Sequence, residues 1–407
     1  MSIASIQNDM KNYASQNSEV DFKKVRDGYY FVKAFGNVGV VETDEGIVVI
    51  DSTLSTAQAE GILSNIRKVT NQPIKYLIYT HGHGDHVGGA RVFKNEGAQI
   101  IAQRNVIARL ERYKELNNYH YIINERQFAT SFQMSNLWDE VLFPDIVYDQ
   151  EYVFTLGGKT FHLIHGKGET DDATVIHIPE DDVVFTGDFI IRSFPNVGNP
   201  AKDIRFAKEW ALMMEKIRNL QPKITIPGHG PYINDSKIFD AHTKAIKESM
   251  EFVQECVVSG LNGGESLEEI LESAELPSHL EEGPYLAQFY GCLDFAIRGT
   301  YRRYTGWYDG NPTNLYPEKS RTVAAEINSL IANEEKILNR VSELIQINKH
   351  RLALYLLDII IDSEGKLCKE AQNVKAEIVA HLSEVDQNYM RKNIYHNASK
   401  VMLKKSH

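Results

Sequence analysis

The strongest candidate for chemistry is the run Thr80-His81-Gly82-His83-Gly84-Asp85-His86, which follows an apolar stretch typical of a β-strand. Its imidazole and carboxylate groups are ligands with which proteins bind zinc, iron or manganese. In an extended loop, we expect His81 and His83 to point one way and Asp85 and His86 to turn to the neighbouring side. Such a loop can serve two divalent ions, which together activate water for hydrolysis. The alternative is a solvated histidine-rich loop, which the small histidine count, 14 in 407 residues, disfavours.

Alternating strands and helices surround this loop and must position it. Residues 28–52 contain three β-rich runs separated by turn residues, and Thr56–Thr70 has the apolar spacing of a helix. After the loop, we expect a short helix, a strand and a second helix up to about Arg112. Strands return over residues 151–188, and a helix over Ala207–Asn219 and one more strand follow. Two such halves predict a four-layer αββα sandwich with helices on both outer faces.

Strand patterns disappear after residue 235. Helical spacing continues in Ser236–Ser259 and Ser266–Glu275, and three or four amphipathic helices are expected between Arg321 and Leu403. The expected fold class is therefore α+β. We expect an αββα catalytic domain over residues 1–235, extended to about residue 260 by a linking helix, and an α-helical domain over residues 261–407.

The stretch Tyr113–Phe143 is rich in aromatic residues and asparagine and has no clean period. We expect an irregular insertion here, because long loops in compact domains usually carry function. Tyr119, Tyr121 and Phe128 are candidates for the wall of an apolar substrate pocket. Ordinary core aromatics are an equally valid interpretation of these residues.

The composition excludes several classes of protein. The chain has 44 Lys and Arg against 55 Asp and Glu, a net charge of −11, which argues against a general binder of nucleic acids or anionic membranes. Cys256, Cys292 and Cys368 are too far apart in sequence for a disulfide framework or a thiolate zinc site. We find neither a signal peptide nor an apolar run of the roughly 18 residues that a membrane span needs. We therefore expect a cytoplasmic protein with no membrane span and no nucleic-acid partner.

The spacing His-x-His-x-Asp-His resembles the signature of the metallo-β-lactamase superfamily, and the strand order resembles that fold over roughly Tyr29–Ile233. The resemblance implies three further site residues by position. Asp188, in a Phe-Thr-Gly-Asp turn, resembles the carboxylate that bridges the two metals. His229, in Pro-Gly-His-Gly, resembles the last histidine of the second metal. Asp51 resembles the strand-end aspartate that holds the histidine loop and is not a ligand.

One position departs from the pattern of most members, which place a histidine in a Gly-His-Thr turn between the loop and Asp188. Here the turn is Gly168-Glu169-Thr170, so Glu169 takes the place of that histidine. The alternatives are that His165 is the ligand or that this ligand is absent. Glutamate at this position resembles the alkyl sulfatase branch of the superfamily. A carboxylate makes the site harder and more anionic, which favours zinc and leaves manganese or iron open.

The C-terminal part supports the same branch. Tyr290-Gly291 and the stretch from Ala296 through Trp307-Tyr308-Asp309-Gly310-Asn311-Pro312 resemble the start of the alkyl sulfatase dimerisation domain. The resemblance implies a homodimer formed through the C-terminal helices. We expect the lipid-carrier-like domain of the long bacterial alkyl sulfatases to be absent.

The resemblance also assigns roles to the site residues. It implies that the first metal is held by His81, His83 and Glu169, the second by Asp85, His86 and His229, with Asp188 as the bridge. Asp85, Asp188 and Arg205 are the expected catalytic residues. Arg205, five residues before Trp210, would pair with the sulfonate oxygens, unless it is a solvated helix residue. Asn196 and Asn199 are further candidates for substrate binding.

The sequence therefore predicts a hydrolase with two divalent metal ions, in the first place Zn²⁺, that cleaves small-molecule sulfate esters such as alkyl sulfates. The alternative activity is hydrolysis of another ester class by the same site: a lactone, a thioester, a phosphodiester or a β-lactam. A third hypothesis is a partner-binding protein whose helical tail does the work. The complete set of expected ligands argues against this third hypothesis.

Overall fold

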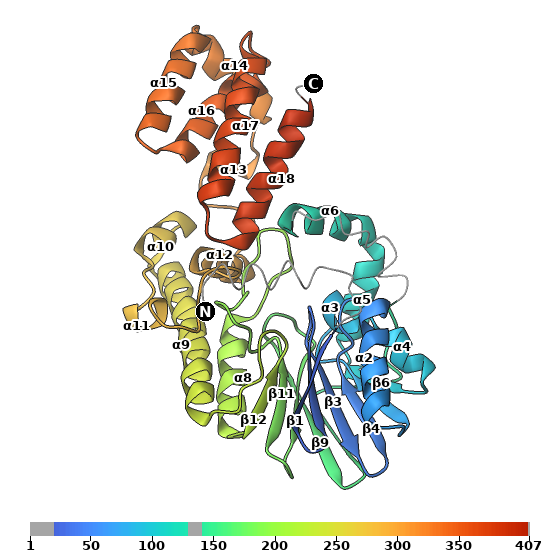
Figure 1. The fold of residues 1–407 in the computed structure, drawn as a ribbon. Coiled ribbons are helices and arrows are strands. Elements are labelled where there is room, and N and C mark those ends of the chain that lie inside the picture. Colours follow the sequence, from blue (N-terminus) through green and yellow to red (C-terminus); the bar gives the residue numbers. More distant parts are fainter. Residues whose placement is uncertain (1–19, 129–140, 406–407) are drawn as a thin grey trace. The chain divides into compact units, whose positions relative to one another are not determined.

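The structure is a computed structural model that describes residues 20–128 and 141–405 (Figure 1). These residues form two compact units. One lies within Met1–His120 and Gln133–Gly306, and the other within Tyr121–Phe132 and Trp307–His407. The domain boundary expected at residues 235–260 lies inside the first unit, because Phe239, Ile246 and Met250 share a core with the sandwich. In the described part of the chain, no helix is long and apolar enough to cross a membrane.

The first sheet has seven strands in chain order, β1 to β7. Neighbours from β1 to β4 run antiparallel, and neighbours from β4 to β7 run parallel. The three β-rich runs expected in residues 28–52 are β2, β3 and β4, so this prediction is confirmed. The strands are β1 (Asp21–Arg26), β2 (Tyr29–Lys33), β3 (Val38–Thr43), β4 (Gly46–Ile50), β5 (Ile74–Ile78), β6 (Gln99–Gln103) and β7 (Ile146–Tyr148).

The second sheet has five strands in the order β12-β11-β10-β9-β8. Only β11 and β12 run parallel, while the other neighbours run antiparallel. All five strands were expected from the sequence. They are β8 (Glu151–Leu156), β9 (Lys159–Gly166), β10 (Ala173–Ile178), β11 (Val183–Gly187) and β12 (Ile224–Pro227).

Helices cover the outer face of each sheet (Figure 1). The helices α2 (Thr56–Val69), α4 (Ala90–Asn95) and α5 (Val106–Glu115) share an apolar core with the first sheet. The helices α8 (Ala207–Asn219) and α9 (Ser236–Gly263) share a core with the second sheet. A third core between the sheets joins Phe31 and Ile50 of the first sheet to Phe161 and Phe185 of the second. The expected αββα sandwich is confirmed.

The strand β4 shows why the sequence folds into these layers. Its five residues, Gly-Ile-Val-Val-Ile, are all buried. Ile47 and Val49 pack in the core beneath the helices, whereas Val48 and Ile50 pack in the core between the sheets. Because successive side chains of a strand point to opposite faces, a strand covered on both sides must be apolar throughout.

Helices make up the rest of both units. The first unit contains α3 (Gly84–Val87), α10 (Leu267–Ser273), α11 (Ser278–Glu281) and α12 (Leu293–Tyr304). The second contains α13 (Pro312–Leu315), α14 (Ser320–Ile331), α15 (Glu334–Gln346), α16 (His350–Asp362), α17 (Cys368–Val385) and α18 (Tyr389–Lys405).

The expectation of three or four helices between Arg321 and Leu403 is wrong, because the structure has five, α14 to α18. The additional break lies between α14 and α15. Ala332 ends α14 with a left-handed φ of 51°, and the Asn333 side chain accepts a hydrogen bond from the Lys336 amide to begin α15.

The expected irregular insertion at Tyr113–Phe143 is wrong over its first half. The helix α5 continues to Glu115, and α6 covers Asn117–Phe128. Apolar residues lie all around α6, so no helical face stands out in its sequence. Residues 129–140 lie outside the described part of the chain, as do residues 1–19, where a loose helix or lead-in was expected.

Candidate metal centre

The expected metal ligands and Asp51 all follow the carboxyl ends of strands, with Asp85 and His86 inside the short helix α3. The strands β4 and β5 are parallel neighbours in one sheet, and β11 and β12 are parallel neighbours in the other. The strand β9 runs in the same direction as β11, because both are antiparallel to β10. The loops at the carboxyl ends of these five strands carry Asp51 after β4, the histidine loop after β5, Glu169 after β9, Asp188 after β11 and His229 after β12.

Asp51 anchors the histidine loop to the end of β4. Its side chain is buried, and its carboxylate accepts hydrogen bonds from the amide and the hydroxyl of Thr80, both at 2.7 Å. The Oδ2 atom of Asp51 also lies 2.7 Å from Nδ1 of His86. Because the Nδ1 side of this imidazole is held by Asp51, its Nε2 atom faces the other histidines and carboxylates.

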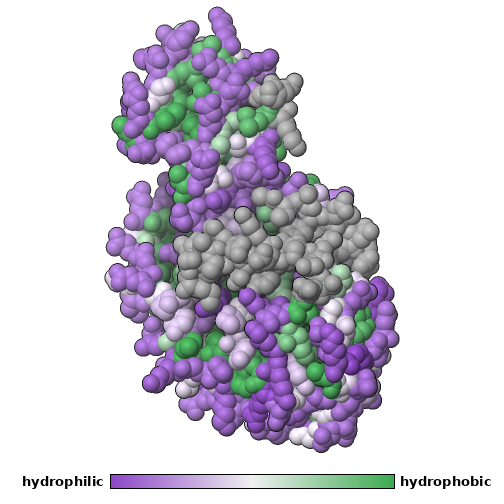
Figure 2. Space-filling model, viewed as in Figure 1, coloured by the Kyte–Doolittle hydropathy of each residue, from purple (hydrophilic) through white to green (hydrophobic). Residues whose placement is uncertain are grey.

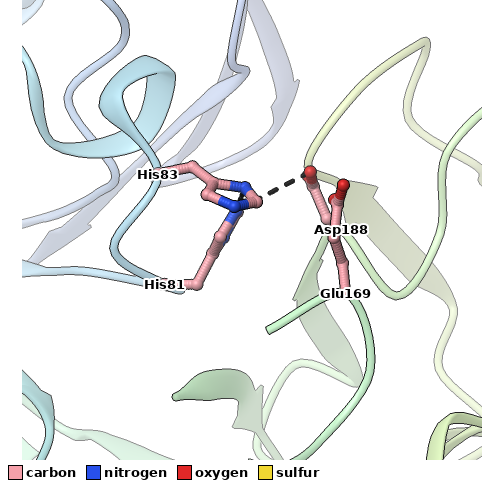
Figure 3. A group of neighbouring side chains, drawn as sticks. All are labelled: His81, His83, Glu169 and Asp188. Atoms are coloured by element: carbon pink, nitrogen blue, oxygen red, sulfur yellow. Dashed lines mark hydrogen bonds and ion pairs between the residues drawn. The ribbon is translucent and has the colours of Figure 1, made fainter. Parts of the chain in front are cut away.

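A first cluster contains His81, His83, Glu169 and Asp188, each with a potential ligand atom within 4.8 Å of those of the others. Figure 3 shows the two imidazoles on one side and the two carboxylates opposite them. The Nε2 atom of His81 lies 2.9 Å from Nδ1 of His83 and 3.7 Å from Oδ2 of Asp188. His165, the alternative ligand, is not in this cluster, and its Nδ1 atom lies 3.2 Å from the carbonyl oxygen of Ala173.

A second cluster contains Asp85, His86 and His229, again within 4.8 Å. The Nε2 atom of His229 lies 3.3 Å from Oδ2 of Asp85 and 3.4 Å from Nε2 of His86. Asp188 lies against this cluster as well, with Oδ1 3.4 Å from Nε2 of His86 and Oδ2 3.4 Å from Nε2 of His229. Asp188 is therefore the carboxylate that contacts both clusters.

The loop with His229 packs so closely on Asp188 that it requires glycine. A Cβ atom on Gly228 would lie 2.0 Å from Oδ1 of Asp188, far inside van der Waals contact. Gly187, just before Asp188, has a φ of +51°, and a Cβ atom there would lie 2.8 Å from the Thr80 side chain. Gly228 therefore lets two loops of the second sheet meet, and Gly187 lets the second sheet approach the histidine loop of the first.

The histidines of the two clusters have opposite pKa shifts. Burial lowers the pKa of His81, and burial together with the neighbouring His81 and Arg205 lowers the pKa of His83 well below its ordinary value. For His86, burial also favours the neutral form, but the carboxylates of Asp188, Asp51 and Asp85 raise its pKa to about 9.

His229 behaves like His86. Asp188 and Asp85 overcome the effect of burial and raise the pKa of His229 well above its ordinary value. Burial also disfavours the ionised form of Asp188, but the imidazoles of His229, His86 and His81 lower its pKa well below the ordinary range.

The residues present fit divalent metal ions. Imidazole nitrogens of the first cluster approach each other at 2.9 Å, and the carboxylates of Glu169 and Asp188 lie side by side (Figure 3). The buried Oδ1 atom of Asp188 has no hydrogen-bond partner among the described residues. Such a group of lone pairs is costly when it is buried without a cation. Nitrogen and oxygen donors of this kind suit zinc, manganese or iron.

Comparisons with known protein families agree with this geometry. Residues 33–229, which include both clusters, match the metallo-beta-lactamase superfamily, and residues 266–405 match the alkyl sulfatase dimerisation family. This chain is a metallo-β-lactamase superfamily protein of the alkyl sulfatase type. The α+β fold class and the family resemblance expected from the sequence are confirmed.

Relatives of this alkyl sulfatase-type protein match it over both parts. It is 23% identical to a linear primary-alkylsulfatase of a Pseudomonas species, over 88% of this chain and 72% of that protein. It is 24% identical to an (R)-specific secondary-alkylsulfatase of Pseudomonas, over 88% of this chain and 58% of that protein. The solved structure of the sec-alkylsulfatase Pisa1 shares the fold, with a TM-score of 0.83 and 20% identity over 97% of this chain and 67% of that one.

The substrate contacts expected for the alkyl sulfatase-type chain lie in different surroundings. Arg205 and Asn196 are buried and both donate hydrogen bonds to Glu169. The Asn199 side chain accepts hydrogen bonds from the amides of Ala201 and Lys202. Tyr119 is 47% exposed, and Tyr121 belongs to the second compact unit.

Several residues around the clusters were not predicted. Asp172 accepts a hydrogen bond from the Gly82 amide at 2.7 Å and from Nε of Arg109 at 2.9 Å, so it supports the histidine loop from the second sheet. Asn37 donates to the carbonyl oxygens of Pro227 and Gly230 at 2.9 and 2.8 Å and so holds the turn of His229. These contacts join residues far apart in sequence, and no local motif marks them.

Two further residues interact electrostatically with the clusters. Burial and the guanidinium of Arg205 lower the pKa of Lys202 to about 7, although the carboxylates of Asp85 and Glu169 act in the opposite direction. Burial and the carboxylate of Glu169 raise the pKa of Tyr290. Tyr290 stands in the Tyr290-Gly291 pair, which is part of the stretch that resembles the alkyl sulfatase dimerisation domain. That resemblance was the sequence signal for this tyrosine.

Proposed function

We propose that this chain hydrolyses sulfate esters, in particular alkyl sulfates, with two divalent metal ions. The observation that carries the proposal is the pair of clusters that share Asp188, in a chain whose similarity to alkylsulfatases extends over 88% of its length. We further propose that the sandwich is the catalytic domain and that the C-terminal helices form the dimer.

The proposed ligands follow the two clusters. His81, His83 and Glu169 would hold one ion, Asp85, His86 and His229 the other, and Asp188 both. When bound, two such ions supply an activated water molecule and neutralise the charge that develops on the leaving group. Asp51 keeps His86 in one orientation, and Asp172 holds the loop of His81 and His83 against the second sheet.

The similarity to type 2 metallo-beta-lactamases, such as that of Bacillus cereus at 24% identity, extends over only half of this chain. The similarity to alkylsulfatases continues into the C-terminal helices. For this reason sulfate esters are preferred over β-lactams and other esters as substrates.

The test is sulfate release from a medium-chain alkyl sulfate by protein whose bound metal has been counted, with the His81→Ala variant as the control. We expect release by the wild type and none by the variant. A wild type that binds two ions but releases no sulfate would contradict the proposed substrate, and lactones, thioesters and phosphodiesters would then be assayed.

We propose Zn²⁺ as the native metal, with manganese or iron as the alternatives. The donor set of four imidazoles and three carboxylates suits zinc, whereas a site without thiolates does not exclude the harder ions. Elemental analysis of protein purified without added metal tests this proposal. Zinc at two equivalents per chain is the expected result, and two equivalents of manganese or iron would refute it.

We also propose a homodimer formed by the second unit. Residues 266–405 match a dimerisation family, and large apolar side chains of this unit are exposed, namely Trp307 at 75%, Tyr316 at 90%, Leu330 at 83% and Tyr355 at 73%. Figure 2 shows hydrophobic residues on the surface of this unit among the hydrophilic ones. Contiguous exposed apolar surface marks interaction sites, and these side chains are the candidates for it. Light scattering at micromolar concentration should give twice the chain mass, and a monomer would refute the proposal.

A further inference from the structure

Glu169 is held from behind by two buried side chains. The Nη1 atom of Arg205 donates to Oε1 of Glu169, and Nδ2 of Asn196 donates to the same oxygen at 2.9 Å. Arg205 Nη1 also donates to the main-chain carbonyl of Asn196. Arg205 is 5% exposed, Asn196 0% and Glu169 9%. Because both donors use Oε1, neither of them occupies Oε2.

The main chain fixes the same arrangement. The amide of Phe206 donates a hydrogen bond to the carbonyl oxygen of Gly168 at 3.0 Å, which ties the segment with Arg205 to the turn with Glu169. The helix α8 begins at the next residue, Ala207, and its buried Trp210 donates from Nε1 to the carbonyl oxygen of Phe189 at 3.1 Å. Arg205 therefore projects from a segment that is anchored to the residue before Glu169 and to the residue after Asp188.

The carboxyl groups of the first cluster explain why a cation, Arg205, lies beside Glu169. Glu169 stands where most members of the superfamily have a histidine, so this chain has one more carboxyl group beside Asp188. A buried carboxylate without a partner is costly, and an arginine supplies a permanent positive charge and a directed hydrogen bond. Arg205 thus compensates at Glu169 for the charge that the glutamate introduces.

We propose that Arg205 and Asn196 are positioning residues, which orient Glu169 toward the metal and balance its charge, and that Arg205 does not bind the sulfonate. This inference rests on the proposed function, because it requires that the first cluster hold a metal ion. It predicts that Glu169 and Arg205 form a coupled pair: a histidine at position 169 is tolerated only when the arginine is also removed.

The experiment is a double-mutant cycle with Glu169→His, Arg205→Met and the combined variant. Metal-free protein is titrated with Zn²⁺ against a chelating dye, which gives the affinity of each ion without any assay of turnover. We expect each single variant to bind one of the two ions about 10- to 100-fold more weakly, with the other ion little affected. The combined variant should recover at least about tenfold of the lost affinity.

Two further variants complete the design. Asn196→Ala leaves the charge unchanged and should weaken the same ion by about tenfold, so it tests the proposal even if Arg205→Met does not fold. Arg391→Met removes another arginine that bonds a carboxylate, that of Asp386, through two atoms at 2.8 and 3.1 Å in the second unit. This matched control should leave both affinities unchanged and should add no coupling to Glu169→His.

The outcomes separate this inference from the proposed function. If Arg205→Met and Asn196→Ala leave both ions bound at wild-type affinity and Arg205→Met raises KM for an alkyl sulfate, Arg205 binds the sulfonate and the inference is overturned. Purely additive effects in the cycle also overturn it. If the wild type releases no sulfate but the cycle shows coupling, the proposed substrate fails and the inference stands. A wild type that binds no Zn²⁺ overturns both.

Discussion

The two candidate ligand clusters use the same kinds of ligand atom, but opposite charges support them. In the first cluster a cation, Arg205, lies behind a carboxylate ligand candidate, Glu169. In the second cluster an anion, Asp51, lies behind an imidazole, His86. The first arrangement supports a negative group and the second a group that can carry a proton.

This difference extends to the electrostatics of the two clusters. In the second cluster, protonated imidazoles and carboxylates neutralise one another, as the raised pKa values of His86 and His229 indicate. The imidazoles of the first cluster have lowered pKa values and provide no such charge, and Arg205 is the cation that bonds its carboxylate, Glu169. Groups outside the ligand set therefore decide how each half of the site is balanced.

Removal of one ligand from each cluster is the most severe test of this comparison. We expect His83→Ala and His229→Ala each to lose one ion and to lower sulfate release by more than about 100-fold. Substitution of a residue that only orients a metal ligand already lowers metal affinity or activity by up to that factor. Metal per chain and sulfate release are measured on the same samples. If either variant alone loses both ions, the two clusters are not separate sites.

Asp51→Asn should have the next largest effect. An amide cannot accept from the amide and hydroxyl of Thr80 and also hold His86 as the carboxylate does. We expect the ion of the second cluster to bind about 10- to 100-fold more weakly and the other ion to be affected less. Zn²⁺ titration measures both affinities. Asp145→Asn is the control, because this carboxylate also bonds a main-chain amide, that of Ile100 at 2.7 Å, but is not part of either cluster. An equal loss at both ions would contradict the comparison.

A buried histidine outside both clusters, His242, provides a comparison for the effect of burial on an imidazole. His242 is buried, stacks on Tyr285 with ring centroids 4.8 Å apart, and burial lowers its pKa to about 4. This pKa lies below the value of roughly 6.5 that a histidine has in an unfolded chain. The contribution of neutral His242 to the free energy of unfolding is therefore fully present above pH 6.5 and is lost as the pH falls through about 4.

Between pH 7 and pH 5, we expect the free energy of unfolding to fall by about 2 kcal/mol more in the wild type than in His242→Phe. Urea unfolding at both pH values measures this difference. Parallel losses in the two proteins would show that His242 is not the group responsible.

The fold was predicted wherever the pattern of residues is local. Apolar runs between turn residues indicated β2, β3 and β4, and helical spacing gave α8 its bounds of Ala207–Asn219. The strand β1 was missed because most of its residues are polar and exposed at the edge of the sheet. The end of α14 was missed because Ala332 adopts a left-handed conformation without being glycine or asparagine.

The sequence predicted those site residues that stand in recognisable motifs. The histidine loop, Glu169, Asp188 and His229 stand in short sequence patterns, and the structure brings them into two clusters. The partners of those residues could not be predicted, because hydrogen bonds such as Arg205 to Glu169 or Asn37 to Pro227 depend on how the two sheets pack. Arg205 shows the limit: its position was recognised, but the group it bonds was not.

The origin of the ligands in both sheets has a consequence for how the chain folds. The histidine loop follows a strand of the first sheet, and Glu169, Asp188 and His229 follow strands of the second. A chain in which the sheets have formed but not docked has only half of each cluster, and contacts between such distant segments form slowly. Uptake of metal during refolding should therefore report the moment at which the two sheets close on each other.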